Sequence, residues 1–158
     1  MKYAYPVRLE PDEDGVYVAS ARDVPEALTE GATVVEAIQE MSAALGAALA
    51  GYIEQGRPVP VPSLPKPREH IVPVAPLVAA KLALRSAMRA QGVSNVGLAE
   101  RLGVSEGAVR RLVNPDHASR IDGVIDALAA LGQCLIIEDQ IQEPPDGRHS
   151  GSQRVVKR

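Results

Sequence analysis

The sequence predicts an α+β protein with two domains, and three observations carry this prediction. Short alternating runs of β-forming residues come first, and a helix with a continuous apolar face follows them. Seven prolines then fall within residues 57–76, after which the pattern is helical. We expect an N-terminal αβ domain at 1–63, a proline-rich linker at 64–76, an all-α domain with a short terminal strand at 77–142, and a disordered tail at 143–158.

The first thirty residues predict a β-hairpin and a short third strand. Residues 2–9 and 16–21 read KYAYPVRL and VYVASA, and the turn-forming PDEDG lies between them. A turn and a strand around 27–29 should follow. Tyr3, Tyr5 and Tyr17 fall on the hairpin, where we expect them to share a core face. A contact with a partner protein is the alternative.

The next segment predicts a long amphipathic helix. Thr33 and Glu36 have the spacing of a capping box, and Gly56 is suited to the helix end. Apolar residues recur at three- and four-residue steps, at Val34, Ala37, Ile38, Met41, Leu45, Ala48, Leu49 and Tyr52. The prolines of 57–76 exclude a helix there, although its Val and Ile residues allow part of it to form an edge strand before the linker.

The C-terminal half predicts four helices, at about 77–91, 95–102, 105–113 and 121–131, with Gly132 ending the last. Residues 134–141, CLIIEDQI, predict a short strand. Cys134 begins this strand, and we expect it to be a small core residue rather than a reactive thiol. The last helix and this strand are the expected dimer interface, because their apolar surface is large for a monomer.

Residues 95–115 have the pattern of a helix-turn-helix. Ala99 supplies the small residue that two steeply crossing helices need, and Gly103 supplies the tolerance of positive φ that the sharp turn needs. Apolar spacing predicts that Val104, Val109 and Leu112 pack the second helix onto the first, at Leu98 and Leu102. The alternative is a plain antiparallel helix pair with solvated arginines.

If the pair is a helix-turn-helix, its second helix enters the major groove of DNA. Ser105 is a suitable N-cap for that helix. Arg110 or Arg111 is then suited to read guanine, and Asn95 and Asn114 are suited to phosphate, with helix caps and turns as their alternative role. The candidate DNA-binding residues are Asn95, Ser105, Glu106, Gly107, Arg110, Arg111 and Asn114.

Charge divides the chain in the same way as the secondary-structure pattern. The chain has a net charge of −3, but residues 1–75 hold six basic and eleven acidic residues, a balance of −5. Residues 81–120 hold seven basic and three acidic residues, a balance of +4. We therefore expect the two halves to face different partners, the basic half facing DNA.

The sequence indicates neither an enzyme nor a cofactor or metal protein. His70, His117 and His149 are scattered, and no nucleophile elbow or phosphate-binding glycine loop is present. Consecutive acids at 12–14 are typical of a solvated turn. A lone cysteine forms no internal disulfide, and the chain shows neither a signal-peptide pattern nor a membrane-length apolar run. We expect a cytoplasmic protein.

Two segments resemble the HicB antitoxin family. Glu30, Gly31, Thr33, Glu36 and Ala37 match its EG-x-T-x-x-EA segment, and residues 54–60 match its EQG-x-P-x-P segment. The match covers about 3–63, and the helical half is similar to the Cro/repressor-like domain that many members append. The chain departs from the family at Ser20 and Ala21, where an aromatic-proline pair is usual, and at Glu26 and Ala27, where Gly-Cys is usual.

This resemblance implies a partial ribonuclease H-like fold for the N-terminal domain. It also implies the antitoxin of a type II toxin-antitoxin system, which neutralises an RNA-cleaving HicA-type toxin and represses its own operon. Operator DNA, the toxin and a second copy of the chain are the implied partners, with no membrane and no cofactor. A ligand-sensing repressor, which needs an apolar pocket, is the alternative, and an enzyme with a residual hydrolase site is the third class.

Overall fold

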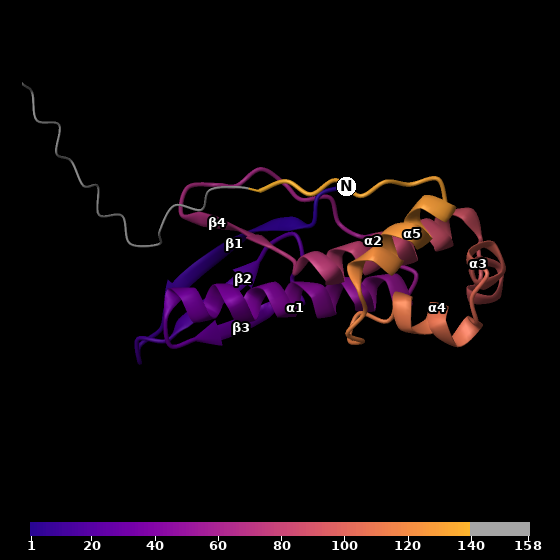
Figure 1. Cartoon of the computed structure of the whole chain (residues 1–158). Coiled ribbons are helices and arrows are strands. Elements are labelled where there is room, and N and C mark those ends of the chain that lie inside the picture. Colours follow the sequence, from indigo (N-terminus) through magenta and orange to yellow (C-terminus); the bar gives the residue numbers. More distant parts are fainter. Residues whose placement is uncertain (140–158) are drawn as a thin grey trace, which may run out of the picture.

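The structure, a computed structural model, describes residues 1–139 and contains a four-stranded sheet and five helices within them (Figure 1). The strands are β1 (Ala4–Pro11), β2 (Tyr17–Ala21), β3 (Leu28–Gly31) and β4 (Glu69–Pro73). The helices are α1 (Val34–Glu54), α2 (Pro76–Gln91), α3 (Asn95–Leu102), α4 (Glu106–Val113) and α5 (Ile121–Ala130). None of the described helices is long and apolar enough to cross a membrane.

The sheet has the order β3-β2-β1-β4, and every neighbouring pair is antiparallel. The predicted hairpin is confirmed, with Val7 opposite Ala21 and Pro11 opposite Tyr17. The predicted third strand is confirmed as β3, which pairs with β2. The elements of this half therefore follow in the order of a strand pair, a short strand, a helix and a further strand.

Helix α1 covers one face of the sheet, and the core of this half lies between them. Because side chains alternate across a strand, Tyr5 and Val7 of β1, Ala19 of β2 and Val72 of β4 all point to the helix and are fully buried. Tyr3 and Tyr17 pack partly buried against the same core, so the expected shared face of the tyrosines is confirmed.

The predicted capping of α1 is observed with one change. Thr33 is the N-cap, and its Oγ1 accepts a hydrogen bond from Glu36 N at 3.1 Å. The Glu36 carboxylate in turn accepts from Ala32 N, one residue before the cap, at 2.9 Å. The helix buries the predicted apolar face and ends at Gln55, followed by Gly56 in the left-handed region.

Strand β4 lies inside the range expected to be a linker. It pairs with β1, with Ala4 opposite Pro73 and Arg8 opposite Glu69, and Val72 fills the core. Five of the seven prolines precede the strand, so they do not interrupt its hydrogen bonds. The N-terminal half therefore extends past residue 63 and includes the fourth strand.

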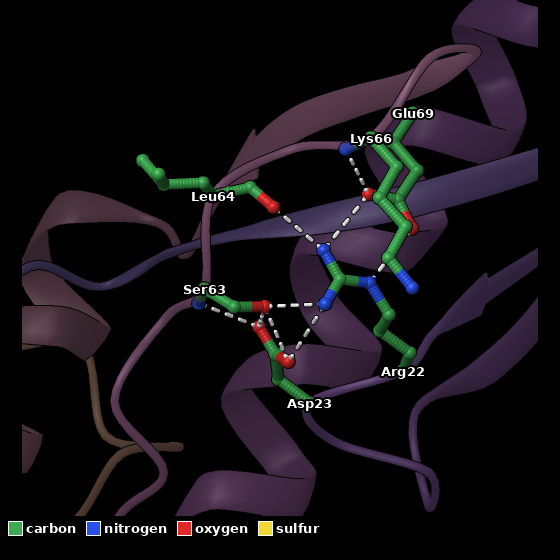
Figure 2. Close-up of polar contacts among 6 residues, drawn as sticks. All are labelled: Arg22, Asp23, Ser63, Leu64, Lys66 and Glu69. Atoms are coloured by element: carbon green, nitrogen blue, oxygen red, sulfur yellow. Dashed lines mark hydrogen bonds and ion pairs between the residues drawn. The ribbon is translucent and has the colours of Figure 1, made fainter.

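The segment 57–68, here called the strap, connects α1 to β4 and is fixed by Arg22 (Figure 2). The Arg22 guanidinium donates to both oxygens of Glu69, at 2.9 and 3.0 Å, and to the Leu64 carbonyl at 2.7 Å. Asp23 accepts from the backbone N–H of Ser63 at 2.9 Å. Arg22 and the Lys66 N–H lower the pKa of Glu69 to about 2, so acid weakens this anchor only as the pH falls below 4.5 toward that value.

Helix α2 belongs to two hydrophobic cores. Leu82 is fully buried in the core of the sheet domain, and Val78 packs against it. Ala80 and Leu84, on the other side of the helix, are fully buried in the core of the C-terminal helices. The expected boundary at 77 therefore falls at a helix that both halves share, as the adjacent positions of α1 and α2 in Figure 1 show.

The segment that follows α5 is not the expected strand. Residues 134–139 have no strand structure, because a strand needs a neighbouring strand and none of the four described strands pairs with them. Cys134 is exposed, so its expected place in the core is wrong. Ile136 and Ile137 are 84% and 71% exposed. The expected tail 143–158, together with 140–142, lies outside the described residues.

The close approach of β3 to α1 yields a stability prediction. A Cβ at Gly31 would lie 2.4 Å from Ala37 N, a backbone atom that cannot move aside. We expect Gly31→Ala to lower the free energy of unfolding by about 1–3 kcal/mol. Gly51→Ala is the matched control, since no atom lies within 4 Å of its Cβ and alanine favours a helix by about 0.5–1 kcal/mol. Urea unfolding with equal midpoints for both variants would refute this account.

Candidate nucleic-acid interface

Helix α3 is a short helix, and hydrogen bonds cap both of its ends. Ser94 is its N-cap, and Ser94 Oγ accepts a hydrogen bond from Gly97 N at 3.1 Å. Gly103 ends the helix at φ 65°, and the following Val104 N–H donates to the Ala99 carbonyl at 3.0 Å. The positive φ predicted for Gly103 is therefore confirmed, and it allows the chain to reverse within two residues.

Helix α4 begins directly after this turn. Ser105 is its N-cap, as predicted, and Ser105 Oγ accepts from Ala108 N at 3.2 Å. Val109 and Leu98 are fully buried in one core, and Leu102 and Leu112 pack partly buried against it. Val104 is 44% exposed, so its predicted packing role is wrong. It lies in the turn, before α4 begins, where the chain turns its side chain away from the helix contact.

Helix α4 carries four of the candidate residues. Arg110 is 69% exposed and forms an ion pair with Glu106, one helical turn earlier, at 2.8 Å. Arg111 is exposed on the same helix. Gly107 lies beside them, and it leaves the backbone of the first turn open to an approaching molecule. The outer face of the helix presents two guanidinium groups and, one helical turn before them, one carboxylate.

The two candidate asparagines lie at the ends of the helix pair. Asn95 is the first residue of α3 and half-buried, but the cap itself is Ser94. Asn114 is the C-cap of α4, and its Oδ1 accepts from Asp116 N at 3.0 Å. The turn role that the sequence left as an alternative is therefore observed for the side-chain oxygen of Asn114.

The structure divides the seven basic residues of 81–120 into two groups. Lys81 is buried, Arg85 pairs with Glu54 at 3.4 Å, and Arg89 donates to the Ile53 and Gly56 carbonyls at the end of α1. The basic residues that remain around α3 and α4 are Arg101, Arg110, Arg111 and Arg120. Against the three acidic residues of the segment, these four leave a balance of +1, which is smaller than the +4 of the whole segment.

Neither Lys81 nor Arg89 was a candidate from sequence alone. A lysine or arginine in an amphipathic helix is normally a solvated residue, and only the packing of α2 between two domains buries one and directs the other. For Arg89 the available signal was its spacing from Arg85, which places both on one helix face.

A cleft lies between the end of α1, α2 and the end of α4. It is open to solvent and is lined in part by Glu54, Arg85, Arg89, Asn95 and Asn114. An enclosed apolar pocket is what a ligand-sensing repressor needs. This cleft does not have that form and gives no support to that alternative.

Comparisons with known proteins identify the family. The model of the family described as "HicB_like antitoxin of bacterial toxin-antitoxin system" matches residues 4–83. The protein named "Antitoxin HicB" of Escherichia coli (strain K12) is 39% identical over 131 residues, which cover 83% of this chain and 95% of that protein. The chain belongs to the HicB-like antitoxin family.

Two further relatives support this assignment. "Antitoxin HicB 2" of Photorhabdus laumondii is 39% identical over 131 residues, covering 83% of this chain and 92% of the relative. "Antitoxin HicB" of Pseudomonas fluorescens (strain Pf0-1) is 34% identical over 137 residues, covering 86% and 92%. These matches are longer than the range of the family model, so the similarity to HicB antitoxins continues into the helices after α2.

Membership in this family of regulatory proteins means that the chain is an antitoxin-family protein and not an enzyme. Two residues of the segment that resembles the family have a structural role in this chain. Gly31 permits the contact of β3 with α1, and Thr33 starts the helix. These residues of the HicB resemblance hold the fold together.

In this helix pair, substitution of two glycines by alanine should change the free energy of unfolding in opposite directions. Gly103→Ala should lower the free energy of unfolding by about 1–2 kcal/mol, because alanine disfavours the left-handed region. Gly107→Ala should raise it by about 0.5–1 kcal/mol, since Gly107 has helical φ and an added Cβ makes only ordinary contacts. Thermal unfolding of both variants checks this, and a stabilised Gly103→Ala would contradict the observed turn.

Proposed function

We propose that this HicB-like antitoxin neutralises an RNA-cleaving HicA-type toxin with its N-terminal domain and represses its own operon with a dimer of C-terminal domains. The observation that carries the proposal is the joining of an antitoxin-family αβ domain to the capped helix pair α3–α4, whose outer face presents Arg110 and Arg111. The partial ribonuclease H-like fold of the N-terminal domain stays a prediction, supported by its element order.

In this proposal α3 and α4 form a Cro/repressor-like helix-turn-helix, and α4 enters the major groove of operator DNA. The N-terminal turn of α4, with Ser105, Glu106 and Gly107, meets the base edges, and Asn95 and Asn114 lie near phosphates. The ion pair between Glu106 and Arg110 orients the Arg110 guanidinium before DNA binds. Arg111 and the exposed Arg101 and Arg120 supply positive charge for the backbone.

The toxin-binding proposal is supported by acidic residues at one end of the sheet domain. The turn between β1 and β2 and the first turns of α1 lie at the same end of the molecule, opposite α3 and α4 (Figure 1). They carry Asp12, Glu13, Asp14, Glu36 and Glu40. An enzyme that cleaves RNA must present basic groups to phosphate, so this end is complementary to it.

A dimer is supported by the apolar segment after α5. A single recognition helix reads too few base pairs for operator specificity, and paired half-sites match a two-fold axis. Residues 134–137 expose Ile136 and Ile137 and have no strand neighbour within the described chain. Pairing of this segment across the axis would satisfy its backbone and cover both side chains.

Arg110 and Arg111 provide the test of DNA recognition. The double variant Arg110→Ala/Arg111→Ala should bind the DNA upstream of the chain's own gene more weakly by about 1–3 kcal/mol for each residue that reads a base. Wild-type affinity should also fall steeply with salt. Gel shifts compare this variant with Arg8→Ala/Lys66→Ala, which removes two exposed charges from the sheet domain. Equal affinities for wild type and the helix α4 variant would refute the assignment.

Light scattering tests the proposed dimer. Wild-type protein should be at least dimeric at micromolar concentration, and Ile136→Asp/Ile137→Asp should shift it toward the monomer, because charge would be buried at the pairing segment. Val61→Asp/Leu64→Asp is the control, since these two strap residues are equally exposed. A monomeric wild type, or dissociation of the control alone, contradicts this interface.

Toxin association should depend on charge at the acidic end. Glu13, Asp14 and Glu40 are the positions for reversal to Lys, because Asp12 accepts two turn hydrogen bonds and Glu36 helps to cap α1. The triple variant should bind toxin with a lower association rate, and salt should slow wild-type association more than it speeds dissociation. Surface plasmon resonance compares it with Glu100→Lys/Asp126→Lys. Association rates that change neither with salt nor with the triple reversal would contradict a steering role for this end.

A further inference from the structure

Among the described residues, Lys81 is a charged residue whose side chain is fully buried. It lies in α2, next to Leu82, and none of its surface reaches solvent. Burial lowers the pKa of its amine, and the charge of Asp116 partly offsets this effect. A buried ammonium is retained in a fold only where polar groups around it replace water.

The groups that replace water here all come from α4 and the chain after it. Lys81 Nζ donates to the carbonyl oxygens of Arg111 at 3.4 Å, Asn114 at 2.7 Å and His117, and to Ser119 Oγ at 3.1 Å. Ser119 Oγ also donates to the Arg111 carbonyl at 3.1 Å. One ammonium therefore contacts oxygen atoms of four residues that lie within the stretch 111–119.

The carbonyl oxygens among these acceptors lie where the backbone forms no regular helix or sheet hydrogen bonds, and the ammonium donates to them. The Arg111 carbonyl is in the last turn of α4, where carbonyls lack partners within the helix and carry the negative end of its dipole. The carbonyls of Asn114 and His117 lie in the reversal 114–120 that leads to α5. Lys81 thus caps α4 and fixes the path of the reversal, tying both to α2.

We infer that Lys81 is a positioning residue for DNA reading, which holds α4 and the reversal 114–120 at the angle that operator recognition requires. This inference rests on the proposed DNA-binding function. Arg111 supplies both a carbonyl to Lys81 and a guanidinium to the outer face, so movement of that backbone moves the guanidinium. Arg120 at the other end of the reversal is exposed in the same way.

Loss of the ammonium should affect specific and non-specific binding differently. Three carbonyl dipoles that converge on an apolar side chain repel one another and lose the ammonium donor that they share, so the backbone must move apart. Hydrogen bonds to base edges need a geometry held within a fraction of an ångström, whereas phosphate attraction tolerates displacement. Lys81 is therefore a determinant of specificity rather than of general DNA affinity.

The first experiment uses the full chain with Lys81→Met, which preserves length and removes charge. The probes are a duplex of the DNA directly upstream of the chain's own gene and a shuffled duplex of equal composition. Affinity for the upstream duplex should fall about tenfold or more, and affinity for the shuffled duplex less than about threefold. The DNA-binding fraction from stoichiometric titration should match wild type. Lys66→Met, an exposed lysine in the strap, should change neither affinity.

Chemical rescue separates positioning from folding. In a Cys134→Ser background, Lys81→Cys is alkylated in denaturant with 2-bromoethylamine or with 1-bromopropane and then refolded. The aminoethyl product restores the ammonium at nearly the length of lysine, and the propyl product is its uncharged isostere. The aminoethyl protein should recover discrimination between the two duplexes, and the propyl protein should not.

Each result decides the inference. Equal discrimination by the aminoethyl and propyl proteins, or by Lys81→Met and wild type, overturns it while leaving the DNA-binding proposal intact. A loss for both duplexes in the same proportion, with a reduced binding fraction, shows a purely structural lysine and also overturns it. A wild type that binds the two duplexes equally refutes operator reading itself, and the role of Lys81 falls with it.

Discussion

Helix α2 is packed on two sides, and the arrangement of the whole chain depends on this double packing. Leu82 completes the core between the sheet and α1, while Ala80 and Leu84 complete the core of the C-terminal helices. Polar contacts follow the same division. Arg89 satisfies carbonyls at the end of α1, and Lys81 satisfies carbonyls at the end of α4. One helix thereby caps two others and fixes the two halves against each other.

The sheet domain shows how a proline-rich segment is kept in place without regular structure. The strap 57–68 contains no helix or strand, yet Arg22, Asp23 and the Tyr5 hydroxyl each hold part of it. Prolines suit this segment because they lose little conformational entropy when ordered and leave few N–H groups to satisfy. The strap then delivers β4 to the edge of the sheet, where Val72 closes the core.

Local sequence signals predicted the parts of the candidate DNA surface that local physics controls. Gly103 at positive φ, Ser105 as a cap and Val109 in the core each follow from the nearest neighbours in the chain. The charge balance was less informative, because a count of basic residues cannot distinguish solvated ones from those used inside the protein. Arg85 and Arg89 face α1, and the net charge around α4 is correspondingly smaller.

The sequence by itself determined the order and type of most elements, since alternation, helical periodicity, caps and turns act over a few residues. It also determined the family, through segments that start α1 and close it. Tertiary structure alone decided that β4 pairs with β1, that residues 134–139 form no strand and that Lys81 is enclosed by carbonyls. Each of these depends on a partner distant in the sequence, and periodicity within a segment contains no information about what that segment will meet.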